Sequence, residues 1–108
     1  MPAYFNTEDL ARFAEVGKGS PELFNLFLAW YDATTQPGAL DAKTKAIIAV
    51  VTAHLVPCPY CIDAWTENAL KLGSTPEELA EAIQVAASLR AGATLAMHIQ
   101  TLNVLDRD

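Results

Sequence analysis

Both cysteines of this 108-residue chain lie in one segment, His54-Leu55-Val56-Pro57-Cys58-Pro59-Tyr60-Cys61-Ile62-Asp63-Ala64-Trp65. A residue that precedes proline is pushed out of the α region, so we expect Val56 and Cys58 to be non-helical. Pro59 suits the first position of a helix, where the N–H that it lacks would have no partner in any case. The segment therefore predicts a helix that begins at Pro59, with Cys58 as its N-cap and Cys61 in its first turn.

The C-x-x-C spacing at the start of a helix indicates redox chemistry. Unpaired backbone N–H groups and the positive end of the helix dipole lower the pKa of a thiol in this position, which favours the nucleophilic thiolate. Two cysteines at this spacing can also form an internal disulfide, so the pair can cycle between dithiol and disulfide. The capping geometry favours Cys58 as the more acidic of the two thiols.

Each of the two histidines has two interpretations. His54 lies one helical turn before Cys58, where it could accept a proton from a cysteine or hold its thiolate. A histidine hydrogen-bonded within the core explains this position equally well. His98 could fold back over the cysteines, although a single histidine on a largely apolar helix is more often structural. We therefore group His54 with the two cysteines as candidate catalytic residues and assign His98 to a candidate substrate pocket.

Two aromatic residues of the same segment are also candidates for that pocket. Trp65 follows Cys61 by four residues, so its indole and that sulfur share one face of the helix. The indole could shield a thiolate from water or shape the pocket, and filling the core is an equally good role. Tyr60, between the two cysteines, is the second aromatic candidate.

The rest of the sequence predicts a single all-α domain of five or six helices over residues 1–108. Caps, prolines and glycines mark the expected helices: from about Thr7 to Val16, from Pro21 after Ser20, from Asp41 to about Val56, from Pro59 to Leu72, from the capping box Thr75-Pro76-Glu77-Glu78 to Leu89, and from Thr94 to about Leu105. We expect Arg90-Ala91-Gly92-Ala93 to interrupt the pattern before the last of these helices.

The apolar faces of these helices indicate what they bury. A stripe on the second helix is expected to be core rather than a substrate channel: Leu23, Phe24, Phe27, Leu28, Trp30 and Tyr31. The helix from Asp41 is apolar nearly all round, so it should be buried on most sides, inside a bundle or at a subunit interface. A hydrophobic fraction of 52% is high for this length and predicts further burial by oligomerisation.

Charge and hydropathy exclude several classes of partner. A formal net charge of −6 argues against nucleic acid and anionic membranes, both of which need basic patches. The start, Met1-Pro2-Ala3-Tyr4, lacks the features of a signal peptide, and the apolar run from Ala46 to Val56 is too short to span a bilayer. We expect a cytoplasmic protein, in which a C-x-x-C pair is more often catalytic or metal-binding than a structural staple.

A family resemblance rests on four segments: Leu40-Asp41-Ala42-Lys43-Thr44-Lys45, Cys58-Pro59-Tyr60-Cys61, Gly73-Ser74-Thr75-Pro76-Glu77-Glu78-Leu79 and Arg90-Ala91-Gly92-Ala93. Together they resemble the AhpD-like superfamily, which includes alkylhydroperoxidases and carboxymuconolactone decarboxylases. The peroxidase-like proteins associated with arsenosugar biosynthesis look similar around Ala53-His54, the C-x-x-C segment and Trp30-Tyr31.

The resemblance implies an all-α fold assembled as homotrimers or homohexamers, with the cysteine pair at a pocket lined by subunits. It implies thiol-dependent reduction of a hydroperoxide without a cofactor. One cysteine becomes a sulfenic acid, the other resolves it to a disulfide, and a thiol or lipoyl reductant restores the dithiol. In the superfamily the second cysteine is usually peroxidatic, which gives that role to Cys61 and the resolving role to Cys58. The capping argument points to Cys58 instead, and we follow the resemblance.

The sequence departs from the alkylhydroperoxidase pattern at two positions. That pattern has a glutamate twelve residues before the first cysteine and a histidine four residues after the second; here these positions are Ala46 and Trp65. The proton relay of those enzymes is therefore missing, with His54 as the nearest replacement base and His98 behind it. No cluster of cationic residues for a dicarboxylate is evident, so lactone decarboxylation is not expected.

Two other functions stay open from the sequence. Cys58, Cys61 and His54 offer three ligands to zinc or to a metalloid such as arsenite, and His98 would be a fourth. Alternatively, the cysteines are inert and the protein is an oligomeric scaffold of the same fold.

Overall fold

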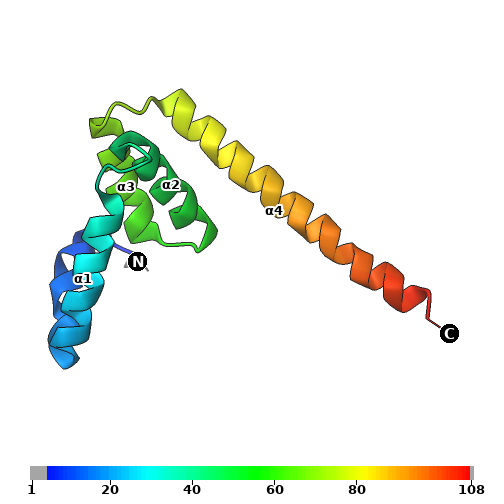
Figure 1. Cartoon of the computed structure of the whole chain (residues 1–108), viewed down its shortest axis with the longest axis horizontal. Helices are drawn as coiled ribbons and strands as arrows, with labels where there is room; N and C mark the ends of the chain where they lie inside the picture. The colour runs from blue at the N-terminus through cyan, green and yellow to red at the C-terminus, as the bar shows by residue number, and fades with distance from the viewer. Residues whose placement is uncertain (1–4, 108) are drawn as a thin grey trace.

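Helices and the turns that join them make up the part of the chain that the computed structural model describes, residues 5–107. A 3-10 helix is followed by four α-helices: η1 (Thr7–Gly19), α1 (Pro21–Thr35), α2 (Ala42–Leu55), α3 (Pro59–Lys71) and α4 (Pro76–Leu105). Five helices without a strand in this range confirm the predicted all-α class (Figure 1). None of these helices is both long and apolar enough to cross a membrane.

Side-chain caps explain where α2 and α4 begin. At α2, the Asp41 carboxylate accepts the N–H of Thr44 at 2.7 Å. At α4, Thr75 and Glu78 form the predicted capping box, with bonds of 3.1 and 2.9 Å between each side chain and the other's N–H. The N–H of Thr75 and the Lys43 ammonium, 3.0 Å away, lower the pKa of the Glu78 carboxyl. The charged cap therefore also ties α4 to α2.

The N-terminal helix differs from the prediction in its cap and its end. Asn6 caps it rather than Thr7, in keeping with the stronger N-cap preference of asparagine, and the helix continues past Val16. Gly17 is buried against Phe24 of α1, and a Cβ at that position would overlap the phenyl ring. Glycine is thus what lets η1 lie directly on α1.

The core lies between α2 and α3, which run side by side (Figure 1). Its buried members are small, so the helix axes can approach closely, and larger partly buried side chains close the cluster. The members are Ala46, Val50 and Ala69, with Trp65, Leu79 and Ile83 packed against them. Full burial of the Val50 side chain contributes about 1.5–3 kcal/mol.

Two predictions of burial are wrong for a single chain. No residue of α1 is buried, so the apolar stripe is not core, and Trp30 is 69% exposed. Only part of α2 is buried, and Ile48 is 48% exposed. The reason is geometric, because the outer half of α4 extends away from the other helices and the described residues leave the outward faces of α1 and α2 uncovered (Figure 1).

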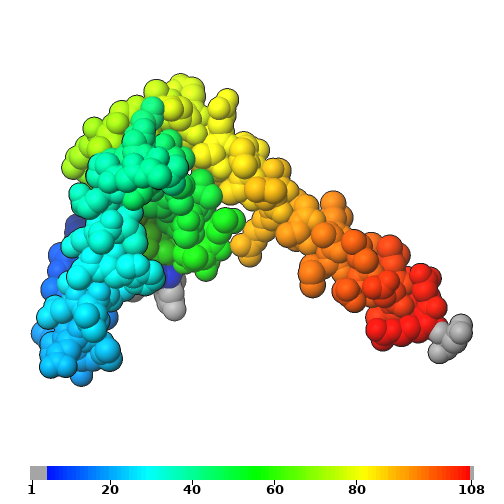
Figure 2. Space-filling model, in the orientation of Figure 1, coloured from blue at the N-terminus to red at the C-terminus, as the bar shows by residue number. Residues whose placement is uncertain are grey.

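α4 is one continuous helix of 30 residues, so the predicted interruption at Arg90-Ala91-Gly92-Ala93 is wrong. A glycine costs a helix about 1 kcal/mol, too little to break one flanked by strong helix formers. Every described residue beyond Ala86 is exposed, and Figures 1 and 2 show the outer half of α4 extending away from the other helices. The radius of gyration is accordingly 18.4 Å, against about 13 Å for a compact domain of this length.

Alanine substitution should have opposite effects at Gly73 and Gly92. Gly73, after the end of α3, has a φ of +98°, so Gly73→Ala should destabilise the fold by about 1–2 kcal/mol. Gly92 is helical with open space where a Cβ would lie, so Gly92→Ala should stabilise by about 0.5–1 kcal/mol. Urea unfolding followed by circular dichroism measures both. A loss of helicity in Gly92→Ala would contradict the continuous helix.

Candidate functional site

The turn between α2 and α3 places both cysteines at the start of α3. Cys58 is the N-cap, as predicted, with an extended backbone, and its Sγ accepts the N–H of Cys61 at 3.2 Å. The N–H of Cys58 donates to the carbonyl of Ala53 at 2.7 Å, which holds the turn against the end of α2. A backbone donor aimed at the Cys58 sulfur stabilises a thiolate there once the pair is reduced.

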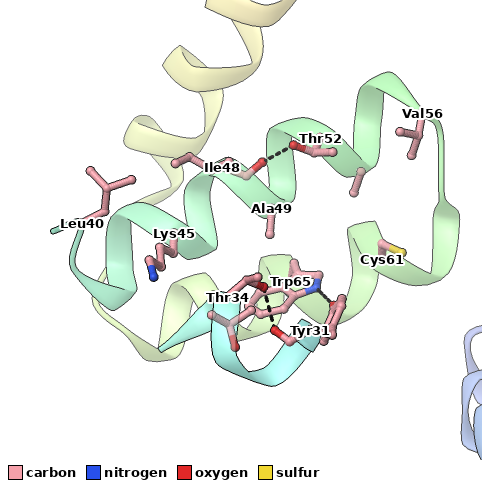
Figure 3. A pocket seen from close by; sticks show the side chains of 12 residues that line it. Tyr31, Thr34, Leu40, Lys45, Ile48, Ala49, Thr52, Val56, Cys61 and Trp65 are labelled. Carbon is pink, nitrogen blue, oxygen red and sulfur yellow. Dashed lines mark hydrogen bonds between the residues drawn. The ribbon is translucent and has the colours of Figure 1, made fainter. Parts of the chain in front are cut away.

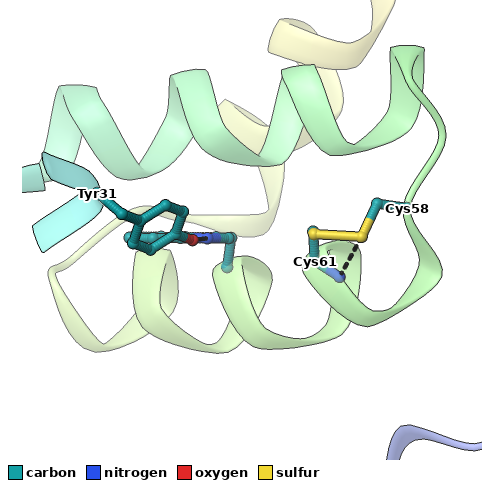
Figure 4. Close-up of a disulfide and its surroundings, with 4 residues drawn as sticks. Tyr31, Cys58 and Cys61 are labelled. Carbon is teal, nitrogen blue, oxygen red and sulfur yellow. Dashed lines mark hydrogen bonds between the residues drawn. A yellow bond between two sulfur atoms is a disulfide. The ribbon is translucent and has the colours of Figure 1, made fainter. Parts of the chain in front are cut away.

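The two cysteines form a disulfide, with 5.2 Å between their Cα atoms (Figure 4). The pairing that the C-x-x-C spacing permits is therefore compatible with the helix start itself. A bond across so few residues constrains the unfolded chain less than one that closes a long loop. The disulfide therefore adds less stability to the fold than a long-range one would.

Cys61 opens on a cavity of about 430 Å³ that α1, α2 and α3 border (Figure 3). Its lining is mostly apolar: Tyr31, Thr34, Thr35, Leu40, Lys45, Ile48, Ala49, Thr52, Ala53, Val56, Cys61 and Trp65. The three threonine hydroxyls all donate to backbone carbonyls of their own helices. Lys45, at the end away from Cys61 in Figure 3, donates to the carbonyl of Gln36.

A second cavity, of about 460 Å³, also reaches Cys61. Residues of η1, α1 and α3 line it: Leu10, Phe13, Phe27, Leu28, Tyr31, Asp32, Tyr60, Cys61, Ala64 and Trp65. The two linings share Tyr31, Cys61 and Trp65, whereas Cys58 belongs to neither. An apolar molecule can therefore approach Cys61 from two sides, whereas neither cavity reaches Cys58.

Trp65 links the core to these cavities. Its Nε1–H donates to the Tyr31 hydroxyl oxygen at 2.6 Å, and the two ring centroids are 6.1 Å apart. The same indole packs against the core cluster, so it serves both in the core and in the cavity walls. The sequence pattern does not identify Tyr31 as a site residue, because its partner lies 34 residues away and no local spacing joins them.

The other candidate residues lie in three different places. His54 Nδ1 is 2.8 Å from the carbonyl oxygen of Val50, and its side chain lines a separate hollow bordered by α2, α3 and α4. His98 is on the exposed outer half of α4. Tyr60 is half-buried, packs edge-on against Phe5 and lines the second cavity.

Metal ligands do not gather around the cysteines. Within residues 5–107, no group of three or more His, Cys, Asp or Glu side chains is arranged to hold a metal ion. His54 and His98 thus do not complete a ligand set with the two thiols in this part of the chain.

Comparison with known proteins shows the family. Residues 21–101 match the carboxymuconolactone decarboxylase family. The chain belongs to this family. A Paracoccus denitrificans relative, uncharacterized protein 4 in cox locus, is 41% identical over 96 residues, which are 89% of this chain and 86% of the relative. An uncharacterized protein of Cupriavidus necator is 34% identical over 79 residues, 73% of this chain and 70% of that protein.

Solved structures share the fold. A carboxymuconolactone decarboxylase family protein from Legionella pneumophila superposes with a TM-score of 0.70 and 36% identity, over 90% of this chain and 88% of that one. A Thermotoga maritima protein superposes with a TM-score of 0.64 at 21% identity, over 90% and 95% of the two chains. The AhpD-like resemblance of the sequence is thereby confirmed at the level of family and fold.

This member of the carboxymuconolactone decarboxylase family has packed apolar side chains at the two positions where the alkylhydroperoxidase pattern has the glutamate and the histidine of its proton relay. Ala46, at the glutamate position, is fully buried, and Trp65, at the histidine position, packs against the cluster that contains it. A glutamate at Ala46 would place a carboxylate in this apolar core, at a high desolvation cost. The two departures therefore belong to one packing unit.

Trp65→Ala should destabilise the protein by about 2–4 kcal/mol, because it removes a core side chain and the bond to Tyr31. Trp30→Ala is the matched control, since Trp30 is 69% exposed in the single chain, and should change stability by less than about 0.5 kcal/mol in a monomeric state. Urea unfolding of both variants measures the difference. Equal effects would contradict the core position of Trp65.

Proposed function

We propose that this protein reduces hydroperoxides with its C-x-x-C pair, Cys61 acting as the peroxidatic cysteine and Cys58 as the resolving one. One observation carries the proposal: Cys61 lines two apolar cavities while it is close enough to Cys58 to bond. Membership in the carboxymuconolactone decarboxylase family supports an enzyme of this superfamily. Access favours Cys61 for attack, and the backbone donor at Cys58 favours that sulfur as a thiolate ready to resolve.

The chemistry requires two steps on the protein. The Cys61 thiolate attacks the terminal oxygen of the hydroperoxide, the O–O bond breaks, and a sulfenic acid forms while the remaining oxygen leaves as an alcohol after it gains a proton. The Cys58 thiolate then attacks the sulfenic sulfur, which forms the disulfide and releases the hydroxyl as water after protonation. An external thiol or lipoyl dithiol returns both electrons by disulfide exchange.

The cavity walls favour an organic hydroperoxide over hydrogen peroxide as substrate. Apolar side chains dominate both linings, and burial of an alkyl or aryl group against them is worth roughly 25 cal/mol per Å². His54 stays in the proposal as a base, with Nδ1 against the Val50 carbonyl and Nε2 left as acceptor. Its side chain lines a hollow separate from both cavities at Cys61, so it takes up the thiol proton through solvent rather than by direct contact with the sulfur.

Assembly as a homotrimer or homohexamer is part of the proposal. The outer half of α4 carries exposed apolar side chains, among them Leu95, Met97 and Leu105, each more than half exposed. The outward face of α1 adds Leu23 and Trp30. Exposed apolar side chains on projecting elements such as these are typical of subunit interfaces.

Reduced protein should lose two thiols per chain when it meets one equivalent of cumene hydroperoxide, and dithiothreitol should restore them. Cys61→Ser should lower the rate of thiol loss at least about 100-fold, because the nucleophile is gone. Cys58→Ser should still react but stop at a sulfenic acid, detected as a dimedone adduct. His54→Ala should slow thiol loss at neutral pH.

The variants also distinguish the alternatives. If Cys58→Ser is inert and Cys61→Ser reacts, the two roles are reversed. If the wild-type protein keeps both thiols, peroxide reduction is not its function, and an inert scaffold or a thiol-binding role for a metalloid gains support.

Light scattering after size exclusion should give a mass three or six times the chain mass of 11.6 kDa. Leu95→Glu should lower this mass, because Leu95 is 74% exposed in the single chain and a carboxylate there cannot be buried. A monomer at all concentrations would contradict the assembly but leave the thiol chemistry unaffected.

A further inference from the structure

Peroxide reduction at Cys61 needs a proton donor that the proposed function does not supply. Cleavage of the O–O bond leaves an alkoxide, which is a poor leaving group unless it is protonated as it departs. The residues that line both cavities are the ones placed to meet that oxygen, whichever side the substrate enters from. Besides Cys61 itself they are Tyr31 and Trp65.

The bond between Tyr31 and Trp65 leaves the tyrosine proton available. An indole N–H can only donate, so in the 2.6 Å bond the Tyr31 oxygen is the acceptor. The phenol O–H must then point elsewhere, and no acceptor for it is found among residues 5–107. Figures 3 and 4 show the Tyr31 side chain reaching along α3 toward Cys61, with its hydroxyl at the end nearer the sulfur.

Other proton donors around Cys61 are already engaged or lie elsewhere. The three threonine hydroxyls of the first cavity donate to helix carbonyls. Lys45 donates to the carbonyl of Gln36 at the far end of that cavity. His54 lines a separate hollow, and of the two cavities at Cys61, Tyr60 borders the second but not the first.

We propose that Tyr31 is the catalytic proton donor to the leaving oxygen and that Trp65 is its positioning residue. The inference rests on the proposed function. As the Cys61 thiolate takes the terminal oxygen with its hydrogen, the alkoxide takes the phenol proton and leaves as an alcohol. The resulting phenolate regains a proton from water. The transfer is favourable because a phenol is a far stronger acid than an alcohol, and the indole N–H stabilises the transient phenolate.

The test compares oxidants that differ in their leaving groups. In Tyr31→Phe, thiol oxidation by cumene hydroperoxide should slow at least about tenfold, within the range of general-acid catalysis. Oxidation by peracetic acid should change less than about twofold, because a carboxylate leaves without prior protonation. Alkylation of the reduced protein by iodoacetamide, which needs no proton donor, should also be unchanged.

Trp65→Phe is the second variant, because it keeps an aromatic ring in the core but removes the N–H donor. It should show the same preference for peracetic acid over cumene hydroperoxide, with a smaller loss than Tyr31→Phe. An equal loss toward all three reagents in Tyr31→Phe would make Tyr31 a structural residue and overturn the inference. A Tyr31→Phe protein as fast as wild type with cumene hydroperoxide would also overturn it, while the peroxidase proposal stands. A wild-type protein that does not react with hydroperoxide defeats the peroxidase proposal itself.

Discussion

The hydrogen bond from the Cys61 N–H to the Cys58 sulfur is the contact on which the site depends. It exists because Pro57, which has no N–H to continue α2, and Pro59, at the first position of α3, leave the extended Cys58 between the two helices as the cap. Val56, expected to be non-helical before a proline, instead keeps an αR backbone as the C-cap of α2. The same short turn forces α2 and α3 to run back along each other and so creates the core of small side chains. One local constraint thus sets the sulfur spacing, the helix pair and the cavity beside it.

The local parts of this structure could be predicted from the sequence. The caps at Asp41, Cys58 and Thr75 depend on side chains within three residues of one another, so their spacing alone locates them. The break expected at Arg90–Ala93 illustrates the limit, since a weak local preference of one glycine yields to a long run of helix formers. Burial was overestimated for a related reason, because periodicity shows which face is apolar but not what covers it.

The candidate site was predictable only in part. The sequence pattern identified the two cysteines and Trp65 as candidates. It did not identify Tyr31, because the hydrogen bond between Tyr31 and Trp65 spans 34 residues and corresponds to no sequence motif. The placement of the two histidines depends on tertiary geometry in the same way. His54 turns toward another hollow, and His98 is carried outward by a helix that the sequence was expected to divide. Site residues within a short motif can therefore be predicted from the sequence. Site residues that distant elements bring together can be identified only from the structure.

Because half of α4 projects from the other helices, the proposed assembly would link the stability of the protein to its concentration. A helix of 30 residues is about 45 Å long, and within residues 5–107 its outer turns are exposed along their whole length. In the proposed assembly, part of the folding free energy would come from neighbouring copies, so stability would rise with the concentration of the chain. Dilution would leave these turns frayed and open to proteases, so cells that express little of the protein would also clear it faster.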